Sequence, residues 1–369
     1  MASFQRVSDA FQGYCDADPS YSAQLALYVG GERVLDLVHG VEADSLLPVY
    51  SSSKGASAVV VALLVQRGQL DLDATVATYW PEFAAGGKRA VTVRQLLSHQ
   101  AGLPGVDGGF TWEEVMAHAP LAERLAAQRP FWQAGQAFMY HALTIGTLAD
   151  ELVRRIDGRT LAQVLHEDVT HPLGIDVRMG TAEADDHRVV DVQPPTADEV
   201  AAYLAESPGA LAPGDDLGSL PLPAGNPLEL LSRVNEVDFR RTGQPAAGML
   251  ASGRGLGALY ASLRHEVGGH PRVLTDDTIS QMSQIQVAGV ELGSGLPARF
   301  GVVFQVPCPP RWAFGSRRAF GHDGAGGSLA FCDPTFDVGF GYTVRRLPLP
   351  GGMDARAVAL AGLVRDCLR

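Results

Sequence analysis

The sequence lacks the features of a membrane-spanning, secreted or nucleic-acid-binding protein. Its longest apolar run, residues 56–65, falls short of the ~18 residues that a membrane span requires. No basic segment followed by an apolar core opens the chain, so we expect no signal peptide and a cytoplasmic location. The net charge of −12 argues against nucleic acid or an anionic membrane as a partner, because either would need a basic surface.

Cysteine is scarce and shows no metal-binding spacing. The four cysteines are far apart, and no Cys-x-x-Cys pair occurs; they are Cys15, Cys308, Cys332 and Cys367. We interpret them as reduced thiols, neither a zinc site nor a disulfide framework. We predict no metal and no cofactor.

Lysine is nearly absent: only Lys54 and Lys88 occur among 29 basic residues. In a chain so strongly biased toward arginine, a lysine can mark a position where arginine cannot serve. Arginine cannot lose its proton near neutral pH, whereas a buried lysine can. Lys88 lies in Ala-Ala-Gly-Gly-Lys-Arg, which we interpret as an exposed loop, so Lys54 is the candidate.

The order of expected elements predicts an α/β fold with an all-helical insertion. Apolar, β-rich runs at 22–28 and 33–38 flank a Gly-Gly hairpin signal, and strands return from 299 onward before a last helix at 353–368. Between these ends the chain is mostly helical, with candidates at 92–98, 112–126, 143–155, 160–168 and 253–265. We therefore expect an antiparallel sheet, built from both chain ends and flanked by helices, with a helical domain inserted.

We place the domain boundaries from this order and from the length of 369 residues, which favours two domains. The discontinuous sheet domain comprises 1–74 and 256–369, and the helical domain comprises 75–255. Within the latter, residues 193–232 are rich in Pro, Gly and Asp. This segment is interpreted either as a long loop or lid, or as a disordered surface insertion.

The segment Ser51-Ser-Ser-Lys54 begins an expected helix that runs to about residue 66. Residues three apart share a helix face, so the Ser51 hydroxyl and the Lys54 amine would be neighbours. A serine needs a base to become a nucleophile, and a buried lysine with a lowered pKa can be that base. The free N–H groups of a helix N-terminus suit a developing oxyanion. The alternative is a serine-rich helix cap followed by a surface lysine.

Two further segments carry candidate residues. Tyr140 follows a turn-like stretch and could relay protons, although a structural core tyrosine is the alternative. His322 begins His-Asp-Gly-Ala-Gly-Gly, a glycine-rich turn that lets backbone approach a ligand closely. A tight hairpin with a structural histidine is the alternative there.

Together these segments resemble the serine β-lactamase and penicillin-binding-protein superfamily, and most closely its class C-like branch, which holds the family VIII carboxylesterases and related acyltransferases. The resemblance runs from about residue 5 to 365. It includes further stretches similar to that branch, at 91–103, 172–174, 245–249 and 321–334.

The resemblance implies roles for the first two motifs. Ser51 matches the acylated serine, Lys54 its general base, and Tyr140 the tyrosine of the Tyr-x-Asn element. The asparagine of that element is Ala142 in this chain, so one group that binds the amide of β-lactam substrates is missing.

The third motif, at His322 and Gly324, also differs from the sequence found in many β-lactamases. His322 and Gly324 match Lys-Thr-Gly of many β-lactamases, written His-x-Gly or Trp-x-Gly in the esterase-like branch. The resemblance implies an oxyanion hole formed by the N–H groups of Ser51 and Ala325. Because a histidine replaces the lysine that binds the carboxylate, penicillin-like substrates are disfavoured.

We therefore expect a carboxylesterase-type acyl-serine hydrolase that takes a small-molecule ester or another acyl donor. The alternatives are an acyltransferase or transacylase of secondary metabolism that passes the acyl group to an alcohol or amine, a D-amino-acid amidase or peptidase, and a non-catalytic sensor. The Gly-x-Ser-x-Gly elbow of α/β-hydrolases does not occur in the sequence.

Overall fold

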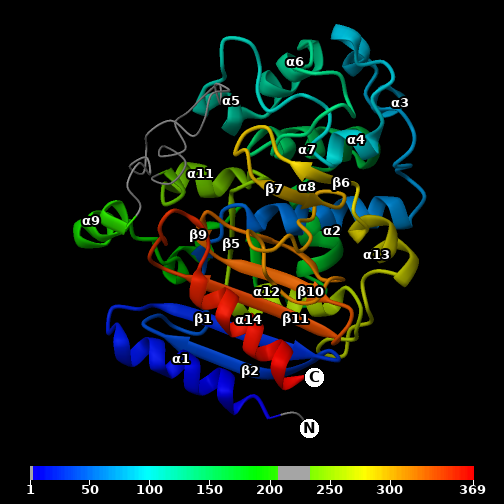
Figure 1. Ribbon diagram of the computed structural model, residues 1–369. Coiled ribbons are helices and arrows are strands. Elements are labelled where there is room, and N and C mark those ends of the chain that lie inside the picture. Colours follow the sequence, from blue (N-terminus) through cyan, green and yellow to red (C-terminus); the bar gives the residue numbers. More distant parts are fainter. Residues whose placement is uncertain (1–2, 207–232) are drawn as a thin grey trace.

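The computed structural model describes residues 3–206 and 233–369 (Figure 1). Its strands are β1 (Ala23–Val29), β2 (Glu32–His39), β3 (Leu47–Pro48), β4 (Val177–Met179), β5 (Met249–Ala251), β6 (Val287–Val290), β7 (Pro297–Phe300), β8 (Phe320–Asp323), β9 (Gly326–Gly327), β10 (Leu329–Asp333), β11 (Val338–Val344) and β12 (Gly352–Met353).

The α-helices lie in the same described ranges. They are α1 (Gln5–Ala17), α2 (Ser52–Gln66), α3 (Val76–Tyr79), α4 (Val93–Leu97), α5 (Trp112–Ala117), α6 (Ala119–Ala127), α7 (Thr144–Asp157), α8 (Leu161–Leu165), α9 (Ala197–Glu206), α11 (Val237–Thr242), α12 (Gly253–Ser262), α13 (Asp276–Ser283) and α14 (Ala355–Cys367).

The main sheet joins the two ends of the chain. It has five strands in the order β2-β1-β11-β10-β8, and every neighbouring pair is antiparallel. The described N-terminal and C-terminal residues lie near each other at the bottom of Figure 1. The antiparallel sheet flanked by helices is thus present as expected, whereas the two domain boundaries stay a prediction.

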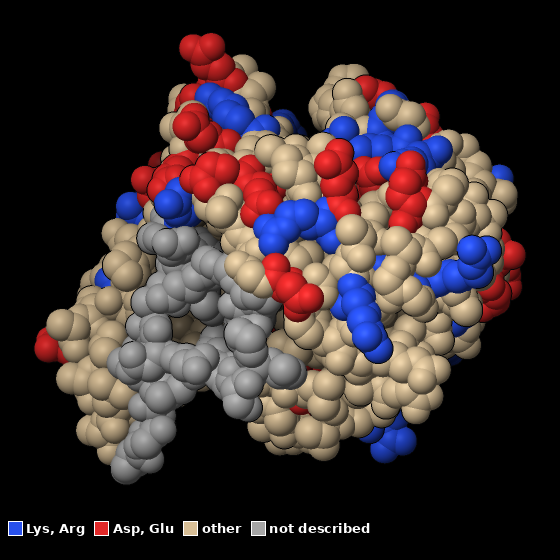
Figure 2. Space-filling view, turned by 90° about the horizontal axis from the view of Figure 1, so that it is seen from above, with Lys and Arg blue, Asp and Glu red and all other residues tan. Residues whose placement is uncertain are grey.

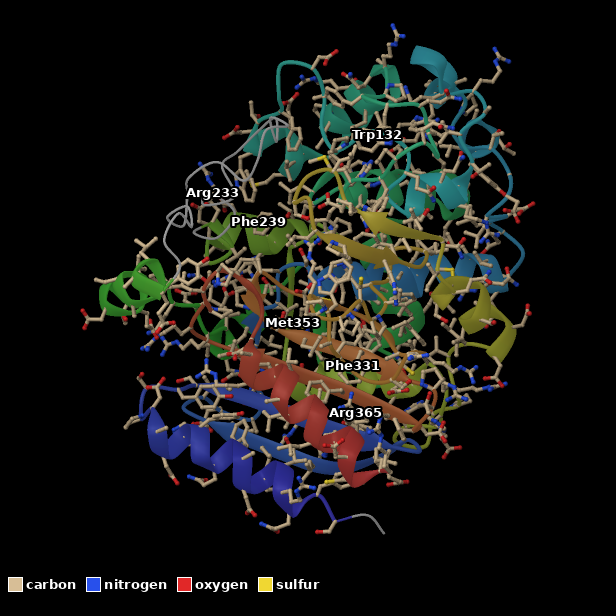
Figure 3. All side chains as sticks on the ribbon, viewed as in Figure 1. Trp132, Arg233, Phe239, Phe331, Met353 and Arg365 are labelled. Carbon is tan, nitrogen blue, oxygen red and sulfur yellow. The ribbon has the colours of Figure 1, made fainter. Side chains whose placement is uncertain are left out.

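Helices cover both faces of this sheet (Figure 1). Alternate residues of a strand point to opposite faces, so Leu25 and Leu27 of β1 pack with α1 and α14, while Ala26 packs toward α2 and α12. Phe331 of β10, labelled beside α14 in Figure 3, belongs to the same core cluster as Leu25, Leu27 and the apolar residues of α1 and α14. The buried face that contains Ala26 holds α2 against the sheet, and this positions the start of α2.

A smaller sheet fixes the chain just before α2. Its order is β3-β5-β4, with both pairs antiparallel. The backbone N–H of Val49 also donates to the carbonyl oxygen of Met249 at 3.0 Å. The segments that precede Ser51 and follow Ala246 are therefore bound to each other.

The helical region departs from its expected boundaries in two places. One expected helix, 112–126, is two helices, because His118 has a positive φ of 63° and Pro120 lies in the first turn of the next one, which begins at Ala119. Within the expected loop 193–232, residues Ala197–Glu206 form α9. The cause is a capping box in which the N–H of Glu199 donates to Thr196 Oγ1 and the N–H of Thr196 donates to the Glu199 carboxylate. The rest of the segment, 207–232, lies outside the described residues.

Lys88 is not in an exposed loop, contrary to the sequence interpretation. Its side chain is fully buried, and Nζ donates to the carbonyl oxygens of Ala85 and Ala126 at 2.9 Å each and to that of Gln128. The last two carbonyls lie at the C-terminal end of α6, where a cation is favourable. The lysine therefore connects two segments instead of facing solvent.

The described surface shows mixed charge. Acidic and basic side chains lie intermixed on the face seen in Figure 2. Among the described helices, none is both long enough and apolar enough to cross a membrane. No group of three or more His, Cys, Asp or Glu side chains in residues 3–206 and 233–369 is arranged to hold a metal ion.

Candidate active site

The start of α2 brings together the two residues that the sequence spacing paired. Ser51 is the N-cap residue and Lys54 lies one turn later, so Lys54 Nζ donates a hydrogen bond to Ser51 Oγ at 2.9 Å. Ser51 is half-buried and Lys54 is fully buried. The serine can be reached from outside, while its partner is shielded from water.

Burial changes the acid–base behaviour of Lys54. It lowers the pKa of the amine from 10.5 to about 7, and the nearby negative charge of Asp323 opposes this shift. The amine also donates to the carbonyl oxygen of Ala246 at 2.9 Å. Near neutral pH a large fraction of Lys54 is therefore neutral and able to accept a proton.

The two serines between Ser51 and Lys54 are buried and hydrogen-bonded to other parts of the chain. The Ser52 hydroxyl shares a hydrogen bond of 2.9 Å with that of Ser328. The Ser53 hydroxyl donates to the carbonyl oxygen of Tyr50 and accepts from the N–H of Met249 at 3.0 Å. Both side chains are buried, so of the three serines only Ser51 both contacts Lys54 and is partly exposed.

Tyr140 lies against Ser51 and Lys54, as the resemblance implies. Lys54 Nζ is 4.9 Å from the centre of its ring, which stacks on Phe300 with centroids 5.9 Å apart. Burial raises the pKa of Tyr140, and its hydrogen bond with Ser51 opposes that rise. The residue is a neutral phenol at neutral pH, able to donate a proton or pass one on.

Sequence reasoning missed the residue that holds Tyr140 in place. Glu291, only 2% exposed, accepts the backbone N–H of Tyr140 at 2.9 Å and those of Gly293 and Ser294 at 3.0 and 2.8 Å. It follows β6, in a stretch for which no element was expected. Nothing in the sequence links Glu291 to a tyrosine 151 positions earlier.

His99 is a second residue that sequence reasoning did not single out. It is fully buried with a positive φ of 65°, and its ring centre is 5.2 Å from that of Tyr140. Its Nδ1 accepts the backbone N–H of His141 at 3.1 Å. A buried non-glycine residue with a positive φ beside a candidate catalytic group is a common feature of active sites.

His322 contributes a neutral ring to the site. It is fully buried on β8, and its ring centre is 5.9 Å from that of Tyr140. Its Nδ1 is 2.7 Å from the carbonyl oxygen of Asp323, so that nitrogen carries the proton, and Nε2 has no partner among the described residues. Burial and the nearby Lys54 hold the pKa of His322 well below its usual range. The ring presents a lone pair and no charge.

The turn after His322 closes the site. A Cβ at Gly324 would collide with the carbonyl oxygen of Val49 and the hydroxyl of Ser328, so only glycine fits there. Gly324 therefore packs tightly against the segment before α2, and not against a ligand. The N–H groups of Ser51 and Ala325, the implied oxyanion hole, donate no hydrogen bond within the described part of the chain.

Comparison with known proteins identifies the family. The family described as "Beta-lactamase" matches residues 8–363. The esterase/beta-lactamase LipL of Mycobacterium tuberculosis is 32% identical over 362 residues, which cover 93% of this chain and 81% of that protein.

Solved structures agree over nearly the whole chain. EstA from Arthrobacter nitroguajacolicus has a TM-score of 0.89 and 38% identity, covering 100% of this chain and 97% of its own. A family VIII carboxylesterase has a TM-score of 0.85 and 32% identity, covering 99% and 97%. The resemblance found from the motifs is confirmed, and this chain belongs to the beta-lactamase family.

Proposed function

We propose that the protein is a carboxylesterase that hydrolyses small esters through an acyl-enzyme on Ser51. The observation that carries this proposal is the 2.9 Å contact between Ser51 Oγ and the amine of Lys54, whose pKa is lowered to about 7. The relatives named esterase and family VIII carboxylesterase, at 32% identity each, support the same class of reaction.

In the proposed reaction, neutral Lys54 takes the proton of Ser51 as Oγ attacks the ester carbonyl carbon. The N–H groups of Ser51 and Ala325 stabilise the oxyanion of the tetrahedral intermediate. Collapse breaks the ester bond, and Tyr140 passes a proton, replaced from Lys54, to the leaving alcohol. Water then attacks the acyl-enzyme while Lys54 takes its proton, and that proton returns to Ser51 Oγ as the bond to the acyl group breaks and the acid is released.

The third motif supports neutral esters over penicillin-like substrates. A neutral imidazole with its lone pair on Nε2 repels a carboxylate, whereas the lysine of Lys-Thr-Gly would attract one. Ala142, in place of the asparagine of Tyr-x-Asn, supplies no amide to bind a substrate amide. Both differences leave the proposed groups for ester cleavage in place.

We further propose that the partner is a small-molecule acyl donor, that water is the usual acceptor and that the protein acts in the cytoplasm. The direct test is intact-protein mass spectrometry after rapid mixing with p-nitrophenyl acetate. Wild type and Ser53→Ala should gain one acetyl group transiently, and Ser51→Ala should gain none. Adding an alcohol or amine distinguishes hydrolysis from transfer, because only transfer yields the acetylated acceptor. Absence of acetylation in wild type under turnover would overturn the proposal.

A further inference from the structure

The second hydrogen bond of Lys54 leads to a turn for which the sequence indicated no role beyond its part in the resemblance. Lys54 Nζ donates to the carbonyl oxygen of Ala246, and the Ser57 hydroxyl of the same helix donates to that of Pro245 at 2.8 Å. The turn, residues 244–248, leads directly into β5. Its position therefore decides where the lysine amine is held.

The side chain of Gln244 fixes the shape of this turn. It is 4% exposed, and its Oε1 accepts the N–H groups of Ala246 and Ala247 at 2.7 and 3.0 Å. The Ala247 N–H is shared with the backbone carbonyl oxygen of Gln244, at the longer distance of 3.2 Å. Its Nε2 donates weakly to the carbonyl oxygen of Leu143 at 3.4 Å, next to α7. One side chain thus accepts from two buried donors of the turn, the first of them by its shortest bond, and ties the turn to a neighbouring helix.

One of these bonds acts on the group that Lys54 contacts. The N–H of Ala247 and the C=O of Ala246 belong to the same peptide unit. Gln244 Oε1 accepts from one side of this unit and Lys54 donates to the other. Hydrogen bonds in such a chain polarise one another, so the bond to Gln244 makes the Ala246 oxygen a stronger and better oriented acceptor.

The turn has no room to move toward α7. A Cβ added to Gly146 of α7 would lie 2.6 Å from the backbone nitrogen of Ala246, so the two backbones are already in close contact. The peptide unit is held by Gln244 on one side and by α7 on another.

We propose that Gln244 is a positioning residue for Lys54, which it acts on through the Ala246–Ala247 peptide unit. The inference rests on the proposed function, in which Lys54 is the base. Because one N–H of the Lys54 amine is held by the Ala246 carbonyl oxygen, the rest of the amine is oriented toward Ser51 Oγ. Loss of this anchor would let the amine rotate, and small misplacements of a catalytic group cost up to ~100-fold in rate.

Other groups face the amine and set the background for a test by pH. Tyr140 lies 4.9 Å away, measured to its ring centre, and the charge of Asp323 favours the ammonium form. His99 and His322 interact with Lys54 electrostatically, and both are held neutral by burial. None of them is altered by a substitution at Gln244, so a change in the pH profile reports on the turn.

The experiment measures kcat and kcat/KM against pH for two nearly isosteric variants. Gln244→Met removes the side-chain acceptor and leaves the Ala247 N–H only the longer bond to the backbone carbonyl oxygen of residue 244, which weakens the Ala246 oxygen as a partner of the ammonium form. The acid limb should move to lower pH while the plateau kcat falls roughly tenfold or more. Gln244→Glu keeps the acceptor and adds a negative charge near the amine. The acid limb should then move to higher pH, by roughly one unit.

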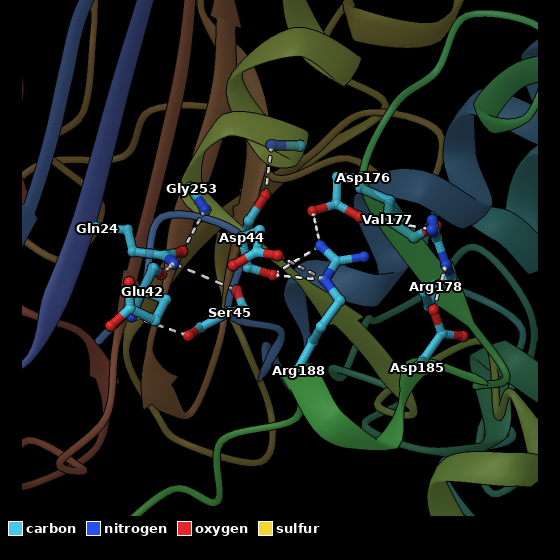
Figure 4. A network of polar contacts seen from close by, with 12 residues as sticks. Gln24, Glu42, Asp44, Ser45, Asp176, Val177, Arg178, Asp185, Arg188 and Gly253 are labelled. Atoms are coloured by element: carbon cyan, nitrogen blue, oxygen red, sulfur yellow. Dashed lines mark hydrogen bonds and ion pairs between the residues drawn. The ribbon is translucent and has the colours of Figure 1, made fainter. Parts of the chain in front are cut away.

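Gln24→Met is the matched control. Gln24 is also a buried glutamine, 2% exposed, with Oε1 accepting the N–H of Gly253 at 2.7 Å and Nε2 donating to the carbonyl oxygens of Glu42 and Ser45 (Figure 4). Its network does not contact the turn. This variant should lose stability and keep the wild-type pH profile.

Opposite displacements of the acid limb in the two Gln244 variants would support the inference. If both kept the wild-type profile and kcat, or changed only the melting temperature as the control does, Gln244 would be merely structural. Should Gln244→Met fail to fold, Gln244→Glu alone decides by the direction of its shift. Failure of the proposed function is separate, because Lys54→Met and Ser51→Ala would then retain activity.

Discussion

Replacement of Lys54 by methionine should abolish activity and, below neutral pH, stabilise the fold. The substitution keeps the length and apolar stem of a fully buried side chain and removes its charge. In the native state burial lowers the pKa of this amine to about 7, whereas its ordinary value is 10.5. The folded protein therefore disfavours the charged form, which the unfolded chain holds without cost.

The size of this effect follows from the shift. The difference between 10.5 and about 7 corresponds to roughly 5 kcal/mol of destabilisation below pH 7, where both states carry the proton. Between the two values the unfolded state binds more protons than the native one, so stability rises with pH. At pH 9.5 only about 1.4 kcal/mol of the cost remains. The variant leaves the Ala246 carbonyl oxygen without the donor it now has, which costs about 1–3 kcal/mol at any pH.

The stability gap between Lys54→Met and wild type should thus change by roughly 3 kcal/mol between pH 6.5 and pH 9.5. With an unfolding entropy of ~2.1 cal/mol/K per residue, this amounts to about 4 °C in a chain of 369 residues. Thermal unfolding of both proteins at the two pH values measures it. The variant should gain most at pH 6.5.

Ser51→Ala is the control for this measurement. It removes activity but keeps the buried amine, so its stability should depend on pH as that of wild type does. A gap between Lys54→Met and wild type that is equal at both pH values would refute the reasoning. Lys54 would then be charged in the folded protein and could not be the base.

The other predictions concern single groups. A fluorophosphonate should label wild type and Ser53→Ala but not Ser51→Ala, since the Ser53 hydroxyl is bound to backbone on both sides; label on Ser51→Ala, read by mass spectrometry, would exclude Ser51 as the nucleophile. Tyr140→Phe keeps the stacked ring and should retain its melting temperature while kcat falls about 10²–10⁴-fold, and an active variant with a lower melting temperature would make the residue structural. Lys88→Arg should destabilise by about 2–3 kcal/mol in denaturant unfolding, because a larger planar group must fit among three carbonyl oxygens; an unchanged midpoint would contradict this. Nitrocefin turnover should be far slower than that of p-nitrophenyl acetate because His322 is neutral, and comparable rates would contradict that assignment.

The parts of the candidate site that sequence predicted are those with a local cause. Ser51 and Lys54 lie three positions apart at a helix start, so their contact follows from helix geometry alone. Tyr140 and His322 are each unremarkable in isolation. They were linked to Ser51 only through the resemblance. In the structure the ring of Tyr140 lies against Lys54, and the ring of His322 lies next to that of Tyr140.

The residues that sequence missed act through backbone groups of distant segments. Glu291 accepts the N–H of Tyr140, and Gln244 accepts N–H groups of the turn that contacts Lys54. A carboxylate or amide that binds a main-chain N–H constrains no side-chain type at the other end. Such pairs leave no motif, and only the tertiary fold shows them.

The scarcity of lysine led to Lys54 as the candidate, but the same argument was not applied to Lys88, which was wrongly placed in an exposed loop. Lys54 and Lys88 are both fully buried, and each donates to backbone carbonyl oxygens. At Lys54 the amine must be able to lose its proton, which a guanidinium does not do near neutral pH. At Lys88 three carbonyl oxygens converge on one point. This arrangement suits the three donors of a compact ammonium and does not suit the planar guanidinium of arginine. In a chain that otherwise uses arginine, both positions keep lysine for reasons that charge alone does not supply.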